Sequence, residues 1–123
     1  MEKLLEITLL YDFYGELLTP NQKNIYELYY QNDLSLGEIS KNLGISRQGV
    51  YDTLKRSEKL LYEYEQRLRL LERFQAKKIL AKKILSCTES IEKYLGLETN
   101  HDKNCLNDLN TIKKLVYKIL DQE

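Results

Sequence analysis

The sequence predicts an all-α protein, and three observations support that prediction. Only one of the 123 residues is Pro and five are Gly, so few positions break a helix. Apolar residues make up 42% and charged residues 31%, a balance that allows a buried core. Apolar side chains recur at spacings of three and four along most of the chain, as amphipathic helices require.

The first two helices are expected over about residues 2–18 and 20–32. The apolar side chains on one face of the first are Leu4, Ile7, Tyr11, Tyr14 and Leu18. Thr19 and Pro20 then restart the chain, because Thr is a good N-cap and Pro at the first helical position loses no hydrogen bond. The residues that share a side of the second helix are Ile25, Leu28 and Tyr29.

The third helix is expected to begin after Ser35 and to end at Gly44. Ser35 and Glu38 form a Ser-x-x-Glu capping box, and Gly44 can adopt the left-handed conformation that closes a helix. Only Ile45 separates Gly44 from a new N-cap, Ser46. Two helices joined so closely must cross at a large angle, as in a helix-turn-helix.

The corner between these two helices needs one small residue and several apolar ones. Ser40 supplies the small residue, and the apolar residues are Ile39, Leu43, Ile45 and Val50. We predict that Leu43 and Ile45 are buried where the helices cross. As a helical corner this pattern is specific, although the same corner also occurs in proteins that bind only protein.

The fourth helix is expected to be a long recognition helix from Gln48 to about Phe74, roughly 42 Å at 1.5 Å per residue. Its apolar residues form a heptad seam: Val50, Leu54, Leu61, Tyr64, Leu68 and Leu71. Half of this seam lies too far along the helix for the first three helices to cover. Either the C-terminal helices fold back over it, or the same helix of a second chain pairs with it. We favour a homodimer, because helix-turn-helix readers commonly pair to span two half-sites.

Two more helices are expected in the C-terminal part of the chain. The seam of the fifth, which ends before Gly96, consists of Ile79, Leu80, Ile84, Cys87, Ile91 and Leu95. A polar connection leads to a last helix over about residues 105–120, with Leu109, Ile112, Val116 and Ile119 on one face. We therefore expect a helix-turn-helix domain over residues 1–74. Residues 75–123 would form a helical extension, packed on the long helix or on a dimer partner.

The net charge is zero, but the charges are unevenly distributed. Residues 1–34 carry six acids and two bases, a net of −4, and residues 84–123 carry seven acids and five bases, a net of −2. Residues 35–83 carry six acids and twelve bases, a net of +6. A nucleic-acid surface would produce this asymmetry, and so would a solvated Lys/Arg face.

The N-terminal turns of a recognition helix enter the major groove, which identifies the candidate binding residues. Arg47 suits bidentate bonds to guanine and Gln48 to adenine, while lysines suit phosphates. The nucleic-acid-binding residues that we predict are Lys41, Arg47, Gln48, Tyr51, Lys55, Arg56 and Lys59. Asp52 is unfavourable beside phosphate unless it orients Arg56. A second basic run, from Arg67 to Lys83, is either a solvated flank or an RNA-backbone site.

Other functional classes find little support in the sequence. Acidic residues interrupt the N-terminal apolar stretch, so we expect no signal peptide, and no run approaches the ~20 apolar residues that cross a bilayer. Cys87, His101 and Cys105 lack the spacing of a metal site, and no catalytic motif stands out. We therefore expect a cytoplasmic protein with no membrane insertion, no catalytic residues, no metal and no cofactor.

Residues 18–61, LTPNQKNIYELYYQNDLSLGEISKNLGISRQGVYDTLKRSEKLL, resemble the promoter-reading region 4 of bacterial sigma factors. Over a longer stretch, from YDFYGELLTPNQ to LLYEYEQRLRLLERF, the chain resembles the YlxM family of helix-turn-helix proteins. The resemblance implies a sigma-region-4-like, winged-helix-like fold. It also implies a regulatory or accessory role with DNA, or alternatively RNA, and with components of the signal recognition particle pathway as partners. A protein-binding adaptor, in which the helix-turn-helix is only a scaffold, is the alternative.

Overall fold

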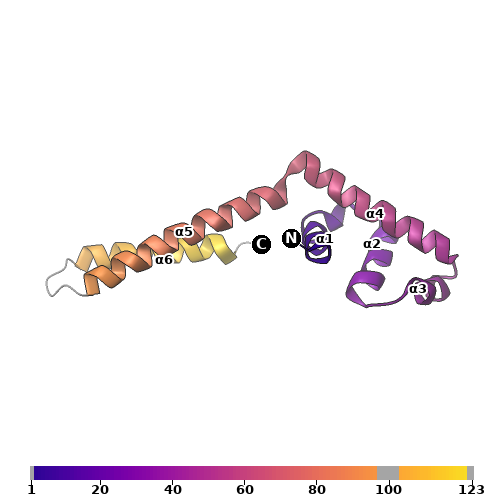
Figure 1. Ribbon diagram of the computed structural model, residues 1–123, viewed down its shortest axis with the longest axis horizontal. Coiled ribbons are helices and arrows are strands. Elements are labelled where there is room, and N and C mark those ends of the chain that lie inside the picture. Colours follow the sequence, from indigo (N-terminus) through magenta and orange to yellow (C-terminus); the bar gives the residue numbers. More distant parts are fainter. Residues whose placement is uncertain (1, 97–102, 122–123) are drawn as a thin grey trace. The chain divides into compact units, whose positions relative to one another are not determined.

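A computed structural model describes residues 2–96 and 103–121. These residues form helices and no strand, which confirms the all-α fold class (Figure 1). The chain divides into two compact units, Met1–Leu71 and Glu72–Glu123.

The first unit contains four α-helices. α1, Lys3–Tyr14, runs into a 3-10 turn, Gly15–Leu17, and α2, Pro20–Tyr26, runs into a π-helical turn, Glu27–Gln31. They are followed by α3, Leu36–Leu43, and α4, Arg47–Leu68.

Local sequence signals begin these helices where they were expected to. The Thr19 hydroxyl accepts a hydrogen bond from the backbone N–H of Gln22 at 3.2 Å, and Pro20 takes the first helical position. In the predicted capping box, the Ser35 hydroxyl accepts from the N–H of Glu38, and the Glu38 carboxylate accepts from the N–H of Ser35. The latter bond is the main reason why the pKa of Glu38 is lowered.

The helix α4 packs against all three preceding helices and so organises the core of the first unit. Its N-terminal half contributes Val50 and Leu54 to a cluster with Ile25 and Ile39. Its C-terminal half contributes Leu61 to a second cluster, which also contains Ile7, Leu10, Tyr14, Leu18, Tyr26 and Leu71. Three of the residues in this second cluster come from α1, and Leu18 directly follows the 3-10 turn after it.

The expectation that half of the α4 seam would lie uncovered is therefore wrong. α1 packs against that half, so Leu61 and Leu71 are buried within the unit and Tyr64 is half-buried. Leu68 differs from the others and is 46% exposed. Leu4 was expected on the buried face of α1 but is exposed, whereas Leu10 is buried in its place. The seam thus offers no reason to invoke a second chain.

The expected unbroken helix to Phe74 is also wrong. α4 ends at Leu68, Arg69 adopts a left-handed conformation with φ of 56°, and α5, Leu70–Gly96, begins immediately afterwards. Tertiary contacts stabilise the break. The Tyr14 hydroxyl accepts from the N–H of Leu70 at 3.0 Å, and the Glu65 carboxylate accepts from the N–H of Leu71 at 3.0 Å. These two groups satisfy backbone donors that the first turn of a helix leaves free.

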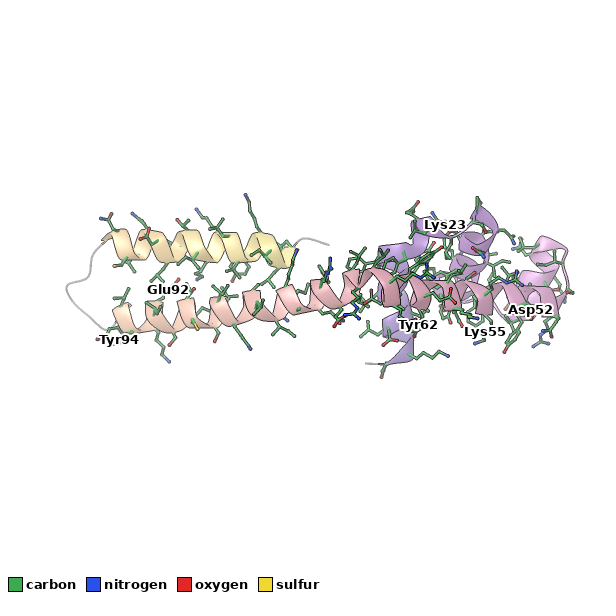
Figure 2. The ribbon with its side chains drawn as sticks, turned by 90° about the horizontal axis from the view of Figure 1, so that it is seen from above. Lys23, Asp52, Lys55, Tyr62, Glu92 and Tyr94 are labelled. Atoms are coloured by element: carbon green, nitrogen blue, oxygen red, sulfur yellow. The ribbon has the colours of Figure 1, made fainter. Side chains whose placement is uncertain are left out.

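The second unit is an antiparallel pair of helices, made by α5 and α6, Lys103–Asp121 (Figures 1 and 2). Their buried residues are Ala81, Thr88, Leu109 and Val116. The Lys113 ammonium lies 3.3 Å from the Glu92 carboxylate, which Figure 2 shows between the two helices. Most members of the seam that we expected on α5 are exposed: Ile79, Leu80, Ile84, Cys87 and Ile91. The buried residues Ala81 and Thr88 lie one position after exposed members of that seam, so the expected seam is offset by one residue from the packed side of the helix.

Candidate nucleic-acid interface

The turn between α3 and α4 is held by backbone geometry and two serines. Gly44 has φ of 68°, which Gly adopts without steric conflict. The Ser40 hydroxyl donates to the carbonyl of Ile45 at 2.5 Å, and the N–H of Gly44 donates to the carbonyl of Ser40 at 3.0 Å. The Ser46 hydroxyl then caps α4 by accepting from the N–H of Gly49 at 3.0 Å. These bonds fix the direction in which α4 leaves the corner.

The interior of the corner only partly matches the prediction that Leu43 and Ile45 are buried. Ile39 and Val50 are fully buried and Leu43 is half-buried against them. Ile45, which we expected to be buried, is 40% exposed. It lies in the turn itself, where Ser40 holds its backbone, and its side chain is not part of the core.

All seven predicted binding residues lie on the surface, and Lys41 belongs to the last turn of α3. On α4, Gln48, Lys55 and Lys59 follow at intervals of seven and four, so they project from one side of the helix. Arg47 and Arg56 flank this stripe on its two sides. The N-terminal half of α4 thus buries Val50 and Leu54 on one side and exposes polar groups on the other.

An open hollow of about 430 Å³ lies at the start of α4. It is lined by Leu36, Arg47, Gln48 and Tyr51. Three of these were predicted as binding residues, and Leu36 of α3 adds an apolar wall that the sequence did not point to. The lining combines a guanidinium, an amide, an aromatic ring and an aliphatic surface, which together can contact a base edge and a thymine methyl.

Gln48 is oriented by Asp52, one turn further along α4. The Gln48 amide nitrogen donates to the Asp52 carboxylate at 2.9 Å. Asp52 was expected to orient Arg56 if it had a positioning role, and the structure pairs it with Gln48 instead. An amide NH₂ has two hydrogens, so Gln48 keeps one N–H and its carbonyl for a ligand.

Lys55 is held by two neighbours on its own helix. Its ammonium lies 3.3 Å from the Glu58 carboxylate and 5.6 Å from the centre of the Tyr51 ring. Glu58 is nearly buried and also accepts a hydrogen bond from the hydroxyl of Tyr30. Burial and this carboxylate both raise the pKa of Tyr30. Figure 2 shows Lys55 and Asp52 along the N-terminal half of α4.

Glu58 and Tyr30 are the positioning residues that the sequence analysis missed. The Lys55–Glu58 spacing of three residues on one helix could have indicated the ion pair. The bond from Tyr30 could not have been inferred, because it joins two helices. In the second basic run, Lys78 packs over the Phe74 ring with 4.5 Å between its ammonium and the ring centre. One of the cations of the possible RNA-backbone site is thus engaged in a contact with an aromatic ring.

Other kinds of site are not evident in the part of the chain that the structure describes. Within residues 2–96 and 103–121, no three potential metal-ligating side chains come together. Cys87 and Cys105 are free and exposed, while His101 lies outside the described residues. None of the described helices has the length and apolarity to span a membrane.

Comparison with known proteins assigns the family. Residues 1–100 match the family model UPF0122, described as "Putative helix-turn-helix protein, YlxM / p13 like". A UPF0122 protein of Thermoanaerobacter sp. (strain X514) is 61% identical over 74 residues, which are 60% of this chain. The match spans 63% of that relative's length, less than two thirds.

Other relatives match over more of their length. A UPF0122 protein of Geobacillus sp. (strain WCH70) is 48% identical over 115 residues, or 94% of this chain and 98% of the relative. One of Shouchella clausii (strain KSM-K16) is 44% identical over 95 residues, or 75% of this chain and 87% of the relative. The helix-turn-helix corner and these matches agree, and the chain belongs to the UPF0122 (YlxM/p13-like) family of helix-turn-helix proteins.

Proposed function

We propose that the protein binds duplex DNA through the first turns of α4. The observation that supports this proposal is the surface at the helix-turn-helix corner, where Arg47, Gln48 and Tyr51 surround an open hollow. Three further basic residues are exposed on α3 and along α4, namely Lys41, Arg56 and Lys59. Arg47 and Gln48 would contact the edges of the DNA bases, and the lysine and arginine side chains of this group would contact phosphates.

The phosphate contacts can be tested with two arginines on the same helix. Arg56 and Arg67 are both exposed on α4, but only Arg56 lies beside the proposed interface. Lys55 is a poorer choice, because it already pairs with Glu58. We expect the log–log plot of affinity against salt to become shallower by about 0.9 in Arg56→Ala, and to stay unchanged in Arg67→Ala.

The base contacts call for a second comparison. We expect Arg47→Ala to weaken binding to a duplex selected from a random pool by about 1–3 kcal/mol, with a smaller effect on a random duplex. Fluorescence anisotropy measures both series. If neither DNA nor RNA bound the unaltered protein at low salt, the proposal would be wrong. Binding of RNA alone would favour the RNA-binding alternative.

The family resemblance supports a broader role, as an accessory or regulatory protein of the signal recognition particle pathway in the cytoplasm. A pull-down from cytosol, with and without nuclease, tests this role. If the particle's components are retained after nuclease treatment, the protein contacts other proteins and the helix-turn-helix serves as a scaffold. If they are lost with nuclease, nucleic acid bridges them. If neither treatment captures them, the pathway assignment is contradicted.

A further inference from the structure

We propose that one face of the α5–α6 hairpin is a homodimer interface, through which two copies of this chain form a four-helix bundle. The face consists of exposed apolar side chains on both helices. On α5 they are Leu80, Ile84, Cys87, Ile91 and Tyr94, and on α6 they are Ile112, Leu115 and Ile119. This surface is distinct from the α4 seam, and the inference is independent of nucleic-acid binding.

The two stripes lie on the same side of the hairpin because of their register. On α5, Leu80 and Ile84 directly precede the inward-facing Ala81 and Leu85. On α6, Leu115 and Ile119 likewise precede inward-facing residues, Val116 and Leu120.

One residue corresponds to a rotation of about 100° of fixed hand. Since the two helices run antiparallel and face each other, the same offset turns both stripes toward one side of the pair. The stripes therefore form a single continuous apolar face.

The face is extensive and apolar on both helices. Leu80 is 60% exposed and Tyr94 is 63% exposed, and the other members of the stripes remain well exposed. Eight contiguous apolar side chains with this exposure make a patch of the kind that monomers rarely leave open, and a standard interface buries about 800 Å² per partner. An uncovered face of this size would be unfavourable in water.

The charges at the two ends of the face favour a second copy as its partner. Lys77 continues the α5 stripe beyond Leu80, and Asp108 continues the α6 stripe beyond Ile112. Because the helices are antiparallel, these charges lie at opposite ends of the hairpin. A two-fold axis that lies in the plane of the face and runs across the helices brings Lys77 of one copy to the same end of the bundle as Asp108 of the other. The face is thus complementary to itself, as an isologous interface requires.

Sedimentation equilibrium of the full chain tests this proposal. At tens of micromolar we expect twice the 14.6 kDa mass of one chain. Ile84→Glu combined with Leu115→Glu should give a single-chain mass, because a dimer would bury unpaired carboxylates in the interface. The helicity of this double variant, measured by circular dichroism, should stay unchanged. The matched control, Ile79→Glu combined with Tyr117→Glu, places the same charges on exposed residues of the same helices outside the face. It should remain dimeric.

Three results would overturn the proposal. The unaltered protein could be monomeric. The control double variant could dissociate as much as the interface double variant. The interface double variant could stay dimeric. Cross-linking gives an independent check that introduces no charge into the face. Cys87 lies midway along the α5 stripe, so a bismaleimide should link two copies, and Cys87→Ser should reduce that linkage. Equal linkage in the Cys87→Ser variant would count against the face.

Discussion

At the scale of single residues, hydrogen bonds between tyrosine hydroxyls and glutamate carboxylates connect the helices of the first unit. The Tyr11 hydroxyl donates to Glu27 at 2.6 Å, joining α1 to the π-helical turn after α2. The Tyr14 hydroxyl donates to Glu65 at 2.6 Å, joining α1 to α4. Buried hydroxyls need partners, and a charged acceptor makes a stronger bond than a neutral one. These pairs therefore place each ring in the core without leaving its polar end unsatisfied.

Replacing Tyr14 with Phe tests the most connected of these hydroxyls. Its loss leaves the Glu65 carboxylate and the Leu70 N–H each short of one partner. We expect Tyr14→Phe to lower the free energy of unfolding by about 1–3 kcal/mol in urea melts. Tyr51→Phe is the control, because the Tyr51 ring is exposed, and its effect should stay within about 0.5 kcal/mol. Equal effects of the two substitutions would show that the Tyr14 hydroxyl does not stabilise the unit.

Two other tyrosines of the first unit predict how stability depends on alkaline pH. Burial is the main cause that raises the pKa values of Tyr26 and Tyr62 to about 12. Above pH ~10 the unfolded chain loses phenolic protons that the folded chain keeps, so the free energy of unfolding should fall as pH rises from 10 to 12. Below pH 10 this contribution is fully present.

Urea melts at a series of pH values measure the decline, and Tyr62→Phe should make it shallower. A decline that is just as steep in Tyr62→Phe would contradict the assignment to that group.

At the scale of elements, the most informative feature is the break between α4 and α5. Arg69 adopts a left-handed conformation that costs a non-glycine residue about 1–2 kcal/mol. Tyr14 and Glu65 offset this cost by satisfying the first backbone donors of α5. The break allows Leu71 to turn into the core beside Leu61. A straight helix would carry Leu71 along the axis of α4 instead.

Two substitutions at Arg69 distinguish a break from a continuous helix. Both Arg69→Gly and Arg69→Ala remove the same side chain, so its contacts cancel in the comparison. At a left-handed position Gly is favoured, and we expect the Gly variant to be more stable than the Ala variant by about 1 kcal/mol. In a continuous helix the order would reverse by a similar amount, because Ala is the better helix former. Thermal and urea melts of the two variants decide between these results.

The elements that the sequence predicted are those controlled by local chemistry. Thr19, Ser35 and Ser46 each cap a helix with a bond that spans three residues, and Gly44 ends α3 through its own backbone conformation. The break at Arg69 has no Gly or Pro to mark it and depends on α1, which no local pattern reveals. The buried positions of α1 were only partly predicted for a similar reason. Leu4 and Leu10 both fit helical spacing, and tertiary packing buries only Leu10.

At the scale of the whole molecule, α4 has two halves with different surroundings. Its C-terminal half is covered by α1, while its N-terminal half leaves a polar side exposed at the helix-turn-helix corner. The sequence could place six of the seven candidate residues on α4 and Lys41 at the end of α3, since helical spacing and the corner pattern are local. It could not show that Asp52 holds Gln48, that Glu58 holds Lys55, or that Leu36 lines the hollow. Those contacts depend on rotamers and on neighbouring helices.

The central claim is that nucleic acid binds at the start of α4, and backbone amide chemical shifts measured during a titration with duplex DNA test it most directly. At low salt we expect the changes in chemical shift to concentrate between Lys41 and Lys59, where the exposed lysine and arginine side chains and the hollow lie. The amides of α6 should stay unchanged, and raising the salt should reverse the shifts as phosphate contacts weaken. Shifts that spread evenly along the chain, that concentrate on α6, or that never occur would contradict the claim.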